Sequence, residues 1–119
     1  MQNRFKYRAI NKKTKEIIYI DNYYWFEANG VCEIENNEAI GFLDEYWIDQ
    51  CTGLKDFNGN LIYENDILKF NQKDDWKPKL VKWQESRYML KDTLIVLCDM
   101  EIKYYKLEKI GITERNNNK

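Results

Sequence analysis

Short stretches in which apolar and polar residues alternate fill much of this chain of 119 residues. From residue 4 to residue 9, apolar side chains at the odd positions alternate with basic ones at the even positions. This period of two is typical of a half-buried β-strand. The polar run 11–15 predicts a turn, and the Ile- and Tyr-rich segment 16–25 predicts the returning strand of an antiparallel hairpin.

The rest of the chain repeats this strand-and-turn pattern. Turn signals at Asn29-Gly30 and Asn36-Asn37 enclose a short predicted strand around 31–34, whereas the apolar run 42–47 is too short to be typed by its period. The continuous apolar run Leu94–Cys98 predicts a strand that is buried on both faces. Further strands are predicted at 46–54, 61–63, 67–70, 80–83, 88–90 and 103–112.

Two tight turns stand out in the middle of the chain. In the first, 55–60, Asp56 and Asn58 can bond the backbone and Gly59 can take a positive φ. In the second, 64–66, Asn65 is the residue best able to adopt the left-handed conformation. Both turns predict sharp reversals between neighbouring strands.

Many short strands at close spacing predict a mainly β fold. We expect a small antiparallel barrel, SH3-like in the C-terminal half, with an N-terminal β-hairpin extension. In such a barrel the acidic corner at Asp66 sets the direction of the following strand, and Trp83 packs the barrel floor. One domain suits a chain of this length, and its 18 aromatic residues supply a core.

Charge is unevenly distributed although the net charge is only -1. Residues 1–20 carry six basic and one acidic side chain, residues 21–67 carry one basic and eleven acidic, and residues 68–119 carry twelve basic and eight acidic. Two interpretations follow. Either the acidic middle folds against the basic ends and the charges cancel, or the middle presents an acidic surface to a basic partner.

Several kinds of chemistry find no residues in this sequence. Histidine is absent, which excludes Ser-His and Cys-His catalysis and histidine-based zinc sites. Cys32, Cys51 and Cys98 are widely spaced and form no C-x-x-C pair, so we expect reduced, buried, inert thiols, with no metal and no cofactor. Neither a membrane span nor a signal peptide is evident, and we expect a cytoplasmic protein with no membrane partner.

The central stretch 50–67 resembles the signature of the YopX family of phage and prophage proteins. Cys51 replaces an aromatic residue of that signature, and Asn65 replaces a glycine. The segments 5–9 and 81–83 are similar to two further motifs of the family. The matching signature residues are Gln50, Thr52, Gly53, Leu54, Asp56, Gly59, Ile62, Tyr63, Glu64, Asp66 and Ile67.

This resemblance implies a mainly β fold, a phage or prophage origin and a bacterial cytoplasm, and it implies no reaction. We expect one YopX-like domain over 1–114, made of an N-terminal hairpin and acidic segment (1–48) and a barrel part (49–114). A frayed tail, 115–119, should follow. The signature itself consists of turn residues, strand residues and corner carboxylates, which predicts an architectural role for its polar groups.

Two surfaces are candidates for binding. Residues 21–49 carry eight acidic side chains and no basic one, among several aromatic residues. Such a surface could dock a basic host protein by electrostatic complementarity. The proposed partner-binding residues are Tyr23, Tyr24, Glu33, Glu35, Asp44 and Glu45.

The alternative surface is a basic one for nucleic acid. Small barrels bind single strands through aromatic stacking and a basic groove. The residues for this role are Lys69, Lys73, Trp76, Lys77, Lys79 and Lys82. Asp74 and Asp75 weaken the positive field there, and a pI near 5.6 is low for a nucleic-acid binder.

The sequence therefore predicts a phage or prophage accessory protein that is not an enzyme. It should act by binding a macromolecule, with a host or defence protein as the first candidate and nucleic acid as the second. The identity of the partner, any small ligand and a homo-oligomeric state all stay open.

Overall fold

The computed structural model describes residues 7–20, 23–26, 31–34, 39–42, 45–73 and 75–115, with only the backbone for Ile20 and for the three short segments between 23 and 42. Eleven strands and one helix follow in chain order. They are β1 (Tyr7–Asn11), β2 (Ile17–Ile20), β3 (Tyr23–Phe26), β4 (Val31–Ile34), β5 (Ala39–Phe42), β6 (Tyr46–Lys55), β7 (Leu61–Tyr63), β8 (Asp66–Phe70), β9 (Lys79–Gln84), β10 (Arg87–Leu90), α1 (Asp99–Tyr105) and β11 (Leu107–Ile112).

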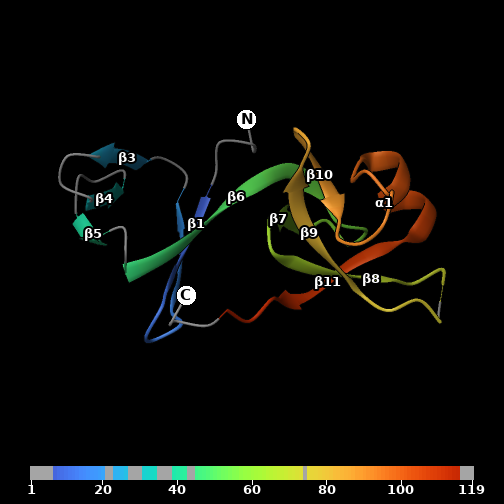
Figure 1. Ribbon diagram of the computed structural model, residues 1–119, viewed down its shortest axis with the longest axis horizontal. Coiled ribbons are helices and arrows are strands. Elements are labelled where there is room, and N and C mark those ends of the chain that lie inside the picture. The colour runs from blue at the N-terminus through green and yellow to red at the C-terminus, as the bar shows by residue number, and fades with distance from the viewer. Residues whose placement is uncertain are drawn as a thin grey trace.

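The long strand β6 joins the two ends of the molecule (Figure 1). Its first half pairs with β1, and its second half pairs with β7, which gives a four-stranded sheet of order β2-β1-β6-β7. The predicted N-terminal hairpin is confirmed as β1 and β2, with Tyr7 opposite Ile20. The sequence predicts its second strand over 16–25, whereas β2 ends at Ile20, and Tyr23–Phe26 forms β3, which pairs with β4 in another sheet. All neighbouring strands in this sheet are antiparallel.

The second sheet, of order β10-β9-β8-β11, curls around the main core. Strand β7 and α1 also contribute to this core, so the first sheet and the helix close parts of the barrel that the second sheet leaves open. The mainly β, small-barrel fold predicted from the sequence is thereby confirmed. The buried core residues are Ile62, Leu68, Phe70, Val81, Leu90, Leu97, Ile102 and Leu107.

The acid-rich middle of the chain contributes a sheet of its own. Strands β3, β4 and β5 pair antiparallel in sequence order, and in the part of the chain that the structure describes none of them joins either larger sheet. In Figure 1 this small sheet lies beyond the end of β6 that is farther from the barrel.

The turn 55–60 forms as the sequence predicts, with Gly59 at φ +90°. Asp56 organises it, because its Oδ1 accepts hydrogen bonds from the backbone N–H groups of Asn58 and Asn60, both at 2.9 Å. Its Oδ2 accepts another from the N–H of Lys109 in β11, also at 2.9 Å. One carboxylate therefore shapes the turn and attaches it to the last strand.

The corner 64–66 is confirmed as well. Asn65 has a φ of 76°, and its backbone N–H donates to the carbonyl of Val81 at 2.8 Å. Its own carbonyl accepts from the N–H of Thr113 at 2.9 Å. The left-handed residue thus holds β9 on one side and the end of β11 on the other.

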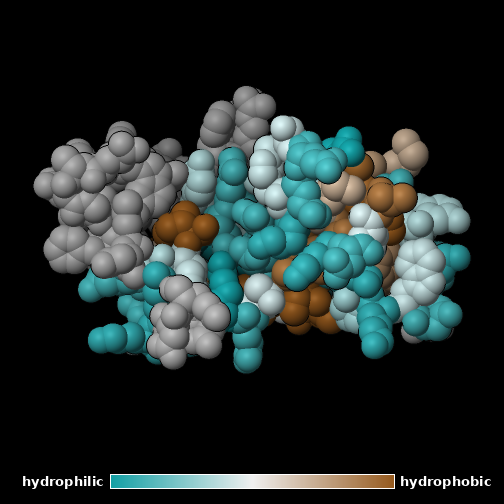
Figure 2. Space-filling model, viewed as in Figure 1, coloured by the Kyte–Doolittle hydropathy of each residue, from teal (hydrophilic) through white to brown (hydrophobic). Residues whose placement is uncertain are grey.

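The prediction of a doubly buried strand at Leu94–Cys98 is wrong. Asp92 is left-handed, and the Thr93 hydroxyl donates to the carbonyl of Leu90 and accepts from the N–H of Ile95, which makes a turn. Only Val96 keeps a strand-like bridge, and Leu94 is 95% exposed. Figure 2 shows brown, apolar side chains at the surface on the barrel side of the molecule.

The strand predicted for 103–112 is shorter in the structure, because α1 occupies the chain up to Tyr105. With seven residues, α1 is too short to show a helical period, and it buries only Ile102. It ends at Lys106, which is left-handed at φ 50° without being glycine, so the usual sequence signal for a helix end is missing.

Trp83 does not pack the barrel floor. It lies at the end of β9, two residues beyond the buried Val81, and it is 52% exposed. Its ring packs edge-on against Tyr88 with centroids 4.7 Å apart. Within the residues that the structure describes, no helix combines the length and the apolar character needed to cross a membrane.

Replacing Asp56 by Ala should lower the free energy of unfolding by about 2–3 kcal/mol, since three backbone donors lose a charged acceptor. Urea unfolding followed by circular dichroism measures this. Asp75→Ala is the matched control, because Asp75 is exposed and its loss should change stability by about 0.5 kcal/mol or less. Equal effects of the two substitutions would refute the role given to Asp56.

Candidate functional site

A cluster of charged side chains lies where the first sheet meets the barrel, and Arg8 is at its centre. Arg8 is fully buried, and it lies directly opposite Asp49 on the neighbouring strand β6. Its Nε donates to Asp49 Oδ2 at 2.8 Å, its Nη1 to Asp66 Oδ1 at 2.6 Å and its Nη2 to the carbonyl of Glu64 at 3.1 Å. All three nitrogens of one guanidinium are therefore engaged.

The two carboxylates of this charge cluster have several further partners. Asp49 accepts from the side-chain amide of Asn65 at 2.8 Å and from both terminal nitrogens of Arg115 at 2.9 Å. Asp66 accepts from the backbone N–H of Tyr63 at 2.7 Å and lies 3.3 Å from Lys109 Nζ. Both carboxylates are fully buried, so these donors replace the water that they have lost.

Burial raises the pKa of Asp49, but the hydrogen bonds and charges around it have the larger combined effect. The hydrogen bond from Arg115, the charge of Arg8 and the hydrogen bond from Asn65 act in the opposite direction and leave the pKa of Asp49 below its ordinary value of 3.8. Asp49 is therefore held as an anion.

The charge cluster draws on all three charge segments of the sequence. Arg8 comes from the basic N-terminal segment, Asp49 and Asp66 from the acidic middle, and Lys109 and Arg115 from the basic C-terminal segment. Part of the charge asymmetry is thus cancelled inside the fold. Arg115 belongs to this cluster, although the sequence placed it at the start of a frayed tail.

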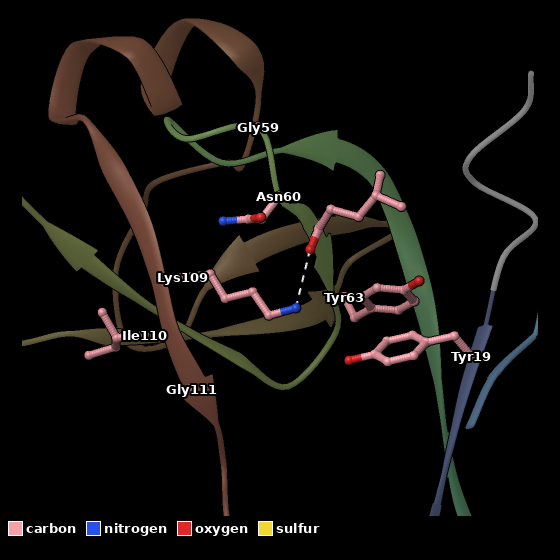
Figure 3. Close-up of a pocket in the computed structure, with 8 residues that line it drawn as sticks. Tyr19, Gly59, Asn60, Tyr63, Lys109, Ile110 and Gly111 are labelled. Carbon is pink, nitrogen blue, oxygen red and sulfur yellow. Dashed lines mark hydrogen bonds between the residues drawn. The ribbon is translucent and has the colours of Figure 1, made fainter. Parts of the chain in front are cut away.

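Beside the charge cluster lies an open groove of about 660 Å³ between the turn 55–60, β7, β2 and β11 (Figure 3). We call it the tyrosine groove, because the rings of Tyr19 and Tyr63 form its aromatic wall, with centroids 5.8 Å apart and planes tilted by 55°. Its lining residues are Tyr19, Gly59, Asn60, Leu61, Tyr63, Lys109, Ile110 and Gly111.

Lys109 links the tyrosine groove to the charge cluster. Figure 3 shows its side chain crossing the groove from β11 toward β7, while Ile110 projects away on the other side of β11. Lys109 Nζ donates to the carbonyl of Leu61 at 3.3 Å and lies 5.3 Å from the centre of the Tyr63 ring. The Arg8 guanidinium also faces that ring, at 4.9 Å. Tyr63 is thus fixed, whereas Tyr19 is 57% exposed.

Most of the predicted acidic site lies outside the residues whose side chains are described. Glu35 and Asp44 lie outside the described residues altogether. For Tyr23, Tyr24 and Glu33 the backbone register is known, and it places Tyr24 directly opposite Glu33 on the adjacent strand. Glu45 is exposed, just before β6. The structure therefore brings one tyrosine and one glutamate of the predicted set together.

The predicted basic site is distributed over several parts of the barrel. Lys69 is exposed on β8, and Lys77 is exposed in the loop before β9. Lys73 Nζ lies 5.5 Å from the centre of the Trp76 ring, and Lys82 Nζ donates to the side-chain oxygen of Asn65 at 3.1 Å. Lys79 is half-buried at the start of β9.

Where they are described, the cysteines Cys51 and Cys98 are free thiols. Cys51 is buried as predicted, whereas Cys98 is only half-buried. Cys32 falls in β4, where only the backbone is described. Among the side chains that the structure describes, no three acidic or cysteine residues gather as a metal site would require.

Sequence reasoning missed the centre of the charge cluster. The alternation in residues 4–9 placed Arg8 on the polar, outward side of a half-buried strand. The structure places β1 between β2 and β6 and buries Arg8 completely. A signal was present nonetheless, because Arg8 lies in the basic segment 1–20, and Asp49 and Asp66 lie in the acidic segment 21–67.

These observations define a class of protein: a small, mainly β fold whose central turn motif and buried charges hold two sheets together. The chain belongs to the YopX protein family, whose model matches residues 6–116. It is also similar to the crystal structure of protein EF1440 from Enterococcus faecalis, with 25% sequence identity, a TM-score of 0.65 and coverage of 90% of this chain and 91% of the other. No curated protein matches it.

Arg8→Met should destabilise the protein by about 3–5 kcal/mol, because Asp49 and Asp66 stay buried but lose the guanidinium that pairs with both of them. Arg87→Met makes the same change at an exposed arginine that lies 4.0 Å from Glu85. It should cost about 1 kcal/mol or less. Urea unfolding of both variants measures the difference, and a tolerant Arg8 site would contradict the role of the charge cluster.

The lowered pKa of Asp49 predicts acid sensitivity. Because the folded pKa lies below that of the unfolded chain, Asp49 stabilises the fold at pH values above about 4, and this contribution is lost as the pH falls through the folded pKa. The free energy of unfolding of Asp49→Asn should therefore fall less steeply below pH 4 than that of the wild type. Asp75→Asn should keep the wild-type slope.

Direct titration of the Asp49 carboxyl carbon by NMR provides a second measurement if Asp49→Asn fails to fold. A midpoint at or above 3.8 would contradict the prediction.

Proposed function

We propose that this chain is a non-enzymatic phage or prophage accessory protein that binds a macromolecular partner. A host or defence protein, which it would inhibit or modulate, is the partner that we favour. Membership of the YopX family supports a role of this general kind. The engagement of the signature carboxylates also supports it, since Asp56 and Asp66 are occupied by donors from the chain itself.

The tyrosine groove is the observation that carries the proposal. It is wide and open, and its walls combine an exposed aromatic ring, a lysine and exposed backbone at Gly59. Tyrosine is among the residues that contribute most to protein–protein binding, because its ring is large and rigid and its hydroxyl can hydrogen-bond. The exposed ring of Tyr19 packs against the fixed ring of Tyr63. Such a surface suits an extended segment of another protein.

The acid-rich segment 21–49, which contributes the small sheet, is a second surface that supports a protein partner. Among the described residues, strands β3, β4 and β5 pair with one another and with no strand of the larger sheets. Tyr23, Tyr24, Glu33, Glu35, Asp44 and Glu45 stay the proposed residues here. Their charges would attract a basic protein and raise the rate of association.

A pull-down from host lysate with the wild-type chain should recover a partner, and Tyr19→Ala should reduce its affinity about tenfold or more. Tyr104→Ala is the matched control, because Tyr104 is 64% exposed on α1, outside the tyrosine groove, and binding should not change. Glu33→Lys tests the small sheet separately and should slow association. Recovery of no partner above background, or equal binding by the two tyrosine variants, would count against the proposal.

Nucleic acid is the second candidate, and one observation favours it. Trp76 is partly exposed at the end of the barrel, and its ring packs against Phe70 and Tyr105, with centroids 5.1 and 5.5 Å away. A fixed, accessible tryptophan beside Lys73 could stack on an unpaired base. In a gel shift at low salt, binding that Lys77→Glu and Lys79→Glu abolish would favour this candidate over a protein partner.

A further inference from the structure

The last strand of the barrel, β11, has an outer edge that is only partly covered. It lies at the end of the sheet β10-β9-β8-β11, so among the described residues β8 is the strand that pairs with it. The turn 55–60 covers the first part of the outer edge. There the N–H of Phe57 donates to the carbonyl of Leu107 at 2.8 Å, and Asp56 accepts from the N–H of Lys109.

The hydrogen-bond pattern shows which backbone groups of β11 point to the open part of this edge. In an antiparallel pair, successive residues point their N–H and C=O groups alternately toward the partner strand and away from it. The N–H of Thr113 donates to the carbonyl of Asn65, and Ile112 lies opposite Asp66. Both backbone groups of Ile112 therefore point outward, and so does the carbonyl of Lys109 on the other side of the bulge. Unpaired groups along an edge are a template for an added strand.

Two hollows follow this edge one after the other. Residues 109–111 line the tyrosine groove, and residues 112–115 line a second pocket of about 360 Å³. We call the second hollow the Trp47 pocket, because Trp47 lies in its wall together with Ile10 and Ile17. The two hollows together are the β11 channel. One stretch of seven consecutive residues thus forms one side of it.

Alternate residues of β2 form part of the opposite wall of the β11 channel. Ile17 lines the Trp47 pocket, and Tyr19 lines the tyrosine groove. Figure 3 shows Tyr19 across the groove from β11. Because Ile17 and Tyr19 are two positions apart on one strand, they face the same side, about 7 Å apart along the strand. Side chains on one face of an added strand repeat with the same spacing, so two of them match the two hollows.

The charges along the β11 channel do not select an ion of either sign. The Trp47 pocket is lined by Lys15 and Arg115, but also by Glu114. Lys109 and Arg115 are each paired with a buried carboxylate of the charge cluster. The features that remain are apolar side chains and backbone groups that can pair. A neutral peptide backbone with apolar side chains suits both of them.

We propose that the β11 channel binds one extended segment of the partner protein, which adds as a strand to the outer edge of β11. Two alternate apolar side chains of this segment occupy the tyrosine groove and the Trp47 pocket. The inference rests on the proposed function and names the form in which the partner is recognised. A second copy of the chain suits the channel less well, because its own β11 is flanked by the turn 55–60 and by β2.

Gly111 offers a way to close the β11 channel without straining the backbone. It lies outside the left-handed region, and a Cβ there would meet no described atom within 4 Å. Gly111→Leu should therefore fold, occupy part of the tyrosine groove and weaken binding about tenfold or more. Gln72→Leu is the matched control, since Gln72 is exposed and lines neither hollow, and it should leave the Kd unchanged.

The probe is a displayed library of random peptides of about nine residues, long enough to run along residues 109–115. It is selected on the full chain and counter-selected on Gly111→Leu. Enriched peptides should carry apolar residues at alternate positions, and their synthetic forms should bind with a Kd on the order of 10–100 µM. Ile17→Ala tests the other hollow and should weaken this binding about threefold or more, which keeps the test decisive if Gly111→Leu fails to fold.

Methylation of the peptide nitrogens, one at a time, distinguishes strand addition from docking through side chains alone. In an added strand every second residue points its N–H at β11. Methylation should therefore weaken binding about tenfold at alternate positions and about twofold or less at the positions between them. A uniform profile would contradict pairing with the edge of β11.

Three further results would overturn the proposal. They are no enrichment relative to Gly111→Leu, equal binding by Gly111→Leu and the wild type, and a changed sedimentation coefficient of the free chain in Gly111→Leu, which would identify a second copy as the occupant. The proposed function fails separately, if the pull-down recovers no partner while the peptides still bind in the β11 channel. A recovered partner whose affinity does not change in Gly111→Leu would refute the strand addition alone.

Discussion

The three-way grip of Arg8 on Asp49, Asp66 and the carbonyl of Glu64 is the interaction on which this architecture depends. Asp49 lies in the first sheet and Asp66 begins the second, so a single guanidinium ties the two sheets together. Each of these ions is fully buried. None of them would be tolerated alone, because the loss of water is offset only when every partner is in place. The cluster therefore specifies one relative placement of the sheets.

Hydrogen bonds from the signature segment 50–67 also fix how the strands are placed relative to one another. Thr52 donates its hydroxyl to the carbonyl of Ile62 at 2.8 Å, and Asp56 reaches β11 through the N–H of Lys109. Asn65 connects the corner to β9 and to the end of β11. These bonds join segments far apart in the sequence, which explains why a short motif can define the fold of the whole chain. They also leave the motif with few polar groups for chemistry on a ligand.

Much of the fold could be predicted from the sequence because its determinants are local. The alternation of apolar and polar residues predicted the strands, and Gly59 and Asn65 predicted the two turns. Strand β7 was predicted with the bounds that the structure shows. The failures have physical reasons too. Leu94–Cys98 is apolar, but the left-handed Asp92 and the hydroxyl of Thr93 make a turn directly before it and into its first residues. The helix α1 is too short to show a helical period. The groove around Tyr19 joins residues that are 40 to 90 positions apart, and no local pattern reports such a contact.

The distribution of charge was the one long-range property visible in the sequence. It allowed two interpretations, namely cancellation of charge inside the fold and an acidic surface for a basic partner. The acidic middle does fold against the basic ends at Asp49 and Asp66, so these two carboxylates are unavailable to any partner. Glu33 of the same acidic segment lies on β4, which among the described residues pairs with β3 and β5 only. Cancellation inside the fold and an acidic surface outside it are therefore compatible, because they use different residues of the same segment.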